Sequence, residues 1–71
     1  MTQLTPLARL HAPLGGQDIE LQQLDFDAGG MSLLRVRIRE KNRFTVIDID
    51  PHSARSWGQA MLDWALRQPG G

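Results

Sequence analysis

The chain has 71 residues, a formal net charge of zero from eight basic and eight acidic side chains, and no cysteine. A chain of this length forms one domain, near the lower size limit at which a single hydrophobic core offsets the entropy lost on folding. The lack of cysteine excludes disulfides and thiolate zinc sites as supports, which leaves association with another chain. The zero net charge excludes a molecule-wide attraction to nucleic acid or anionic lipid.

The N-terminal residues 1–6 have neither the basic start nor the long apolar run of a targeting segment. No later stretch approaches the ~20 apolar residues of a membrane span. We therefore expect a cytoplasmic protein. No serine lies in a nucleophile turn and no glycine-rich phosphate loop precedes a helix, so we expect no enzymatic activity and no cofactor.

The first predicted element, residues 7–12, has two interpretations. Its side chains alternate weakly between apolar and polar and lead toward the turn-forming Gly15 and Gly16, which indicates a short strand. Thr5 as a helix cap, with Pro6 at the first helical position, would equally start a helical turn. We expect the strand and keep the helical turn as the alternative.

Three longer strands are predicted next, over residues 18–26, 32–40 and 43–50. The middle strand alternates strictly, with aliphatic side chains at positions 34, 36 and 38 and arginines at positions 35, 37 and 39. Such alternation is typical of a strand with one buried and one solvated face. The glycine-rich residues 27–30 and the pair Lys41-Asn42, in which asparagine tolerates a left-handed conformation, provide the turns of an antiparallel meander.

The register of each hairpin follows from the position of its turn. Turns centred on Gly15-Gly16, Ala28-Gly29 and Lys41-Asn42 predict aliphatic pairs on one face: Leu10 with Leu21, Ala12 with Ile19, Ile19 with Ile38, Leu21 with Val36, Val36 with Ile47, and Leu34 with Ile49. The same turns predict polar pairs on the other face: His11 with Glu20, Asp18 with Arg39, Glu20 with Arg37, and Arg35 with Asp48. A slip of one residue in either later hairpin would set Val36 opposite a carboxylate, which favours these registers.

Asp50 and Pro51 predict the start of a helix, as its N-cap and its first residue. Pro69 stops the helix, so we expect it over about residues 51–68, with a tail at residues 69–71. The middle of its apolar stripe is formed by Ala54, Trp57, Met61 and Ala65, with Gly58 among them and Trp64 and Leu66 toward the edges. A glycine in the stripe allows close approach to a sheet.

The predicted fold class is α+β. We expect an antiparallel three- to four-stranded β-meander with one C-terminal helix packed on one face, in a single domain over residues 1–71. The covered face carries Leu21, Leu34, Val36, Ile38, Ile47 and Ile49. A helix about 10 Å wide cannot cover four strands spaced about 4.8 Å apart, so part of this face stays open.

The opposite face gathers apolar side chains that no remaining part of the chain covers. They are Leu7, Leu24, Phe26, Met31, Leu33, Phe44 and Val46, with Trp64 of the helix at the rim. A patch of this size in a small domain favours a protein–protein interface, either in a homodimer or with a larger partner. The alternative is that these are ordinary exposed apolar residues between charged rows.

A second functional hypothesis is nucleic-acid binding through the arginine-bearing strand and the turn after it. The candidate residues are Arg35, Arg37, Arg39, Lys41 and Arg43, which suit phosphate contacts and guanine edges. The predicted register sets carboxylates opposite the three strand arginines, which favours a neutralised ladder over a binding surface for nucleic acid.

Three further patterns carry less chemistry than they suggest. Asp48, Asp50 and His52 alternate as metal ligands could, but Asp50 is needed as the helix cap and the helix breaks the alternation, so we expect no metal site. His11 beside Glu20 indicates a surface pair rather than an acid–base dyad. The terminal Gly70-Gly71 resembles the diglycine end of ubiquitin-like and sulfur-carrier proteins. In those families the diglycine follows a strand, whereas here it follows a predicted helix and Pro69, so we expect a plain tail.

Overall fold

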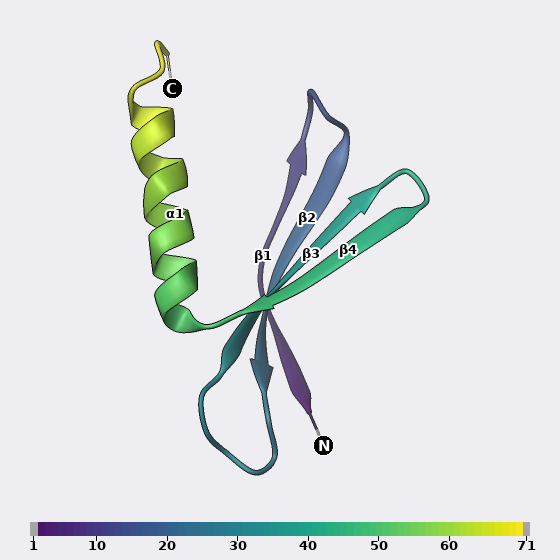
Figure 1. The fold of residues 1–71 in the computed structure, drawn as a ribbon. Coiled ribbons are helices and arrows are strands. Elements are labelled where there is room, and N and C mark those ends of the chain that lie inside the picture. Colours follow the sequence, from purple (N-terminus) through teal and green to yellow (C-terminus); the bar gives the residue numbers. More distant parts are fainter. Residues whose placement is uncertain (1, 71) are drawn as a thin grey trace.

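The computed structural model describes residues 2–70, which form a four-stranded antiparallel sheet followed by one helix (Figure 1). The elements are β1 (Gln3–Ala12), β2 (Gln17–Asp25), β3 (Leu33–Glu40), β4 (Arg43–Ile49) and α1 (Pro51–Leu66), and the strands pair in the order β1-β2-β3-β4. This confirms the predicted α+β fold class. The predicted tail extends to Gly71, which lies outside the described residues.

The two hairpins that contain β3 have the predicted registers. Ile19 lies opposite Ile38 and Glu20 opposite Arg37 in the β2–β3 pair, and Val36 lies opposite Ile47 in the β3–β4 pair. Because residues opposite one another share a face, these registers separate aliphatic from charged side chains across three strands.

The loops of these hairpins differ in detail from the prediction. The β2–β3 loop covers residues 26–32, and Gly29 and Gly30 within it have φ angles of 80° and 95°, which glycine adopts at little cost. In the β3–β4 turn the positive φ of 53° belongs to Lys41 rather than to Asn42. Both connections stay centred where predicted, and the registers are therefore preserved.

The first segment is a strand, and the helical-turn alternative is wrong. The β1 strand is longer than predicted, and its pairing with β2 is shifted by two residues, so that Leu10 meets Ile19 and His11 meets Asp18. The shift arises because Pro13 has no N–H to donate to a ladder, and the turn therefore covers residues 13–16. A shift of two keeps each side chain on its predicted face.

A β-bulge between Pro6 and Ala8 changes the faces of the first half of β1. Beyond it, Leu4 lies opposite Leu24, the place predicted for Leu7. Leu7 instead lines a hollow with Leu34 and Ala54 at the start of α1. The predicted row of Leu7, Leu24 and Leu33 is therefore wrong, since Leu4 replaces Leu7 in it.

The helix begins as predicted. Asp50 is the N-cap, its carboxylate accepts a hydrogen bond of 3.1 Å from the backbone N–H of Ser53, and Pro51 is the first helical residue. The last helical residue is Leu66, close to the predicted end.

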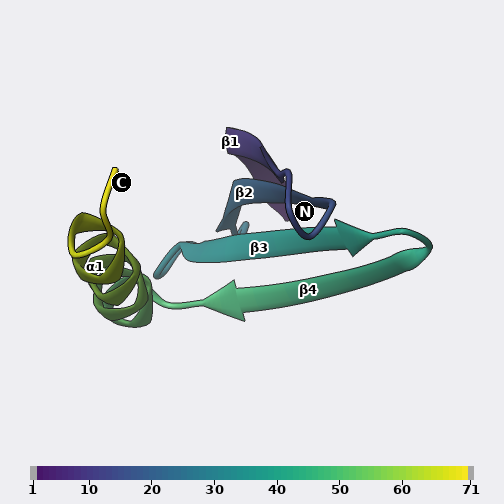
Figure 2. The same ribbon diagram turned by 90° about the horizontal axis from the view of Figure 1, so that it is seen from above.

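The helix covers much less of the sheet than the sequence predicts. It stands beside the end of the sheet at which β4 finishes, as Figures 1 and 2 show, and its few contacts with the strands fall mainly on β3. No residue of α1 is buried, and a Cβ built on Gly58 would meet open space, so this glycine serves no close approach within the chain. The sequence predicts a helix that covers part of the aliphatic side, and the structure reduces this cover to the few contacts with β3.

The consequence is a domain with almost no core. Among residues 2–70, only Leu24 and Val36 are buried hydrophobic residues, each with 4% of its surface exposed. They lie on opposite faces, Val36 between Leu21 and Ile47 and Leu24 between Leu4 and Leu33. The Cα radius of gyration is 14.0 Å, against about 11 Å for a typical domain of this length.

We predict that Leu24→Ala lowers the free energy of unfolding by about 2–3 kcal/mol, because it removes most of one of the two buried side chains. Urea unfolding followed by circular dichroism measures this change. The matched control is Leu14→Ala, the same substitution at a fully exposed position in the β1–β2 turn, expected to shift stability by less than about 0.5 kcal/mol. Equal effects at the two positions would contradict the assigned core.

Candidate interaction surfaces

One face of the sheet, here called the charged face, carries ladders of paired charges from all four strands. On β2, Asp18 accepts hydrogen bonds of 2.7 Å from Arg39 Nη2 and 2.8 Å from His11 Nδ1. Its neighbour Glu20 lies between two arginines, 3.7 Å from Arg9 Nη2 and 4.0 Å from Arg37 Nη1. His11 is therefore paired with Asp18 and not with Glu20 as predicted, a direct result of the shifted β1 register.

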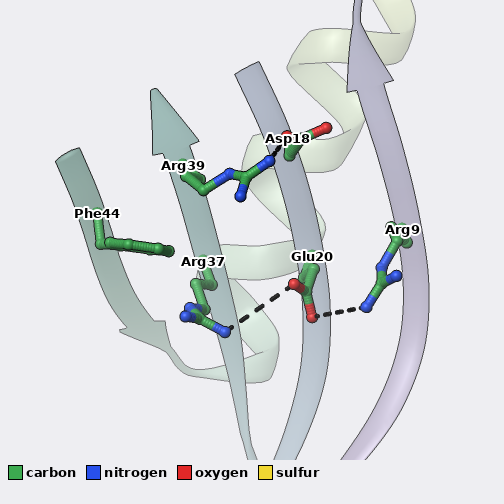
Figure 3. A pocket seen from close by; sticks show the side chains of 6 residues that line it. All are labelled: Arg9, Asp18, Glu20, Arg37, Arg39 and Phe44. Atoms are coloured by element: carbon green, nitrogen blue, oxygen red, sulfur yellow. Dashed lines mark hydrogen bonds and ion pairs between the residues drawn. The ribbon is translucent and has the colours of Figure 1, made fainter. Parts of the chain in front are cut away.

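Figure 3 shows how these groups line a shallow hollow. Arg9, Asp18, Glu20, Arg37, Arg39 and Phe44 surround it. The guanidinium of Arg37 lies 4.7 Å from the centre of the Phe44 ring, a cation–π distance. Each carboxylate in the hollow has basic partners within the chain.

The strongest pair on this face joins Arg35 to Asp48 across β3 and β4. It is bidentate, with Nε to Oδ1 at 2.8 Å and Nη2 to Oδ2 at 3.0 Å, and both side chains are about two-thirds covered (29% and 30% exposed). The hydrogen bonds that Arg35 donates to Asp48 lower the pKa of Asp48, and the same bonds raise the pKa of Arg35. The pKa of Asp18 is lowered in the same way by His11 and Arg39.

The residues considered for nucleic-acid binding are thus divided by the structure. Arg35, Arg37 and Arg39 each face a carboxylate on a neighbouring strand. Lys41 and Arg43 lie at the β3–β4 turn, where they line a second hollow with Glu40. This arrangement offers phosphate groups a surface whose positive charge is already largely compensated.

The eight residues considered for a protein interface do not form one patch. Leu24 is buried and Leu33 half-buried, while Phe26 and Met31 are exposed in the β2–β3 loop. Phe44 and Val46 lie on β4, beside the charged hollow and opposite Arg37, respectively. The remaining two, Leu7 and Trp64, lie on the other side of the sheet and on the helix.

The other face of the sheet, here called the aliphatic face, is also apolar. It carries Leu10, Ile19, Leu21, Leu34, Val36, Ile38, Ile47 and Ile49 from the four strands. Only Val36 of this set is buried, and Leu10 and Ile47 are 51% and 39% exposed. The residues that the sequence assigned to a core under the helix are therefore a half-open surface.

The helix adds a second apolar surface, the helix stripe. A shallow hollow along it is lined by Trp57, Ala60, Met61, Trp64 and Ala65, and both tryptophans and Met61 are more than 40% exposed. Trp64 lies within the stripe and not at its edge as predicted. Its spacing from Trp57 and Met61, seven and three residues, is the signal in the sequence that identifies this position.

Asp48 and Asp50, which alternate with His52 in the sequence as metal ligands could, are engaged with other partners in the structure. Asp48 is bound to Arg35 and Asp50 caps the helix through Ser53. Within residues 2–70, no three side chains of the histidine, cysteine, aspartate or glutamate type come together as metal ligands. No helix in the same range has the length and apolar character needed to cross a bilayer.

These surfaces define a small α+β domain with one charged face, one half-open aliphatic face and an amphipathic helix beside them. A protein-family model matches residues 1–67, and the chain belongs to that family, described as a family of unknown function (DUF6967). Comparison with curated proteins and with solved structures gave no match.

We predict that the melting temperature falls when the pH drops below about 4. Hydrogen bonds hold the pKa values of Asp18, Asp25, Asp48 and Asp50 below the ordinary value, so these carboxylates add stability above that value and lose it as the pH falls through their folded-state pKa values. Thermal melts at fixed protein concentration from pH 7 to pH 2.5 measure the loss. Arg35→Gln lowers the neutral-pH melting temperature and shrinks the loss on acidification; an unchanged loss would contradict the assigned pairing of Asp48.

Proposed function

We propose that this chain is a small, non-enzymatic cytoplasmic module that works by binding another protein chain. The observation that carries the proposal is that the domain has almost no core and leaves two apolar surfaces open, the aliphatic face and the helix stripe. Contiguous apolar surface on a small domain marks a site of protein contact. A partner that covers it also stabilises the folded state by mass action.

The proposal assigns the contact to the aliphatic face and the helix stripe, and not to the opposite face favoured by the sequence. On that opposite face Leu24 is already buried, and the arginines around the remaining apolar side chains already pair with carboxylates within the chain. Covering that face would remove several ion pairs from water. The centre of the aliphatic face, where Leu21, Val36 and Ile47 lie side by side, carries no charged group.

The two tryptophans support the same assignment. Trp57 and Trp64 are 42% and 60% exposed, and with Met61 they form a continuous row on the helix. Tryptophan and methionine are enriched in the cores of protein interfaces, and tryptophan is among the residues that contribute most to binding energy.

We predict that a photoreactive phenylalanine derivative placed at position 47 forms covalent adducts with protein in the cells that express the chain, several-fold more than the same group at position 46. Ile47 and Val46 are neighbours on β4 with similar exposure, 39% and 50%, but they lie on opposite faces. Adducts are measured by gel electrophoresis and mass spectrometry. An absence of protein adducts at position 47, or equal yields at both positions, would contradict the proposed function.

A further inference from the structure

We infer that the chain that covers the open apolar surface is a second copy of this one, with α1 of each copy lying on the aliphatic face of the other about a two-fold axis. The inference rests on the proposed function and adds the identity of the partner and the elements in contact.

The helix and the sheet of one copy do not cover each other. Only Asp50 separates Ile49 of β4 from Pro51 of α1. Asp50 is extended (φ −76°, ψ 164°), its side chain is engaged in the cap, and the ring of Pro51 restricts the backbone. This short, rigid connection directs the helix past the end of the sheet, as Figure 2 shows, instead of back across the aliphatic face.

A partner that completes the domain must therefore supply two things at once. The aliphatic face fits an amphipathic helix, and the helix stripe fits an apolar sheet face. A second copy carries both. A two-fold axis makes the two contacts equivalent, since the helix of the first copy lies on the sheet of the second and the reverse contact follows by symmetry.

The area that the chain exposes agrees with a partner as large as a second copy. The chain exposes 5793 Å², whereas a folded monomer of its mass of 8.0 kDa exposes about 4,450 Å². The excess of about 1,300 Å² exceeds the roughly 800 Å² that each partner buries in a standard interface and lies in the range of permanent dimers. A short peptide would leave much of this area open.

The charges permit self-association. The net charge of the chain is zero, so two copies do not repel one another at long range. The charged face, with its paired ladders, stays on the outside of such a dimer and keeps its water. Within the helix stripe no side chain is ionisable, so a second sheet covers it without desolvating a charge.

The first measurement is the mass of the purified full chain by sedimentation at high micromolar concentration. We expect twice the chain mass. Ile47→Lys on the aliphatic face and Met61→Glu in the helix stripe each raise the dissociation constant by more than about tenfold, because each buries an unpaired charge in the contact.

The matched controls are the neighbouring residues. Val46→Lys lies on the charged side of the same strand, and Leu62→Glu lies next to Met61 but outside the hollow of the helix stripe. The exposures are similar within each pair, 50% against 39% and 54% against 52%. Both controls are expected to remain dimeric, and circular dichroism checks that all four variants fold.

Mixing the two disruptive variants tests the helix-on-sheet contact itself. In a mixed dimer the unchanged helix of the Ile47→Lys copy lies on the unchanged sheet of the Met61→Glu copy. The opposite contact contains both the new lysine and the new glutamate, whose charges are of opposite sign. We therefore expect the mixture to associate although neither variant does so alone.

The outcomes separate this inference from the proposed function. A dimer that is not restored by mixing overturns the helix-on-sheet contact. A wild-type monomer that still forms adducts at position 47 with a different protein overturns the second copy and leaves the proposed function in place. A monomer without adducts overturns both, and a dimer restored by mixing supports both.

Discussion

The register between β2 and β3 is the constraint on which the rest of the structure depends. It sets Leu21 against Val36 on one side and Glu20 against Arg37 on the other, and β4 continues the same separation. Because side chains alternate along a strand, a shift of one residue would exchange the two sets completely. The charged ladders and the aliphatic face are therefore two results of one pairing.

The two faces meet solvent in different ways. The charged face satisfies its own groups, since Asp18 and Glu20 each contact two basic side chains and Asp48 binds Arg35 with two hydrogen bonds. The apolar side chains of the aliphatic face cannot be stabilised by such pairing, because they gain free energy only when they are removed from water. The helix that could exclude water lies beyond the end of the strands.

The sequence was sufficient to predict the elements whose signals are local. The alternation of apolar and polar residues predicted the three later strands, and the positions of the two turns beside β3 predicted both of its registers. Asp50 followed by Pro51 predicted the start of the helix. The predicted β1–β2 register was wrong because Pro13 lengthened the turn and Pro6 adjoins a bulge. Neither effect is visible in the alternation of apolar and polar residues along the sequence. The extent of helix packing on the sheet was predicted wrongly, because an apolar stripe shows which face of a helix is suited to burial but does not show which surface covers it.

The bulge beside Pro6 also affects how this sheet can grow. An edge strand with regular, unpaired backbone groups adds further strands readily, whereas a proline and a bulge remove donors and twist the edge away. On β1 both devices occur together, next to the apolar Leu4 and Leu7. They guard the outer edge of β1 against fibril-like stacking through its backbone, and the sheet therefore does not grow by strand addition at this edge.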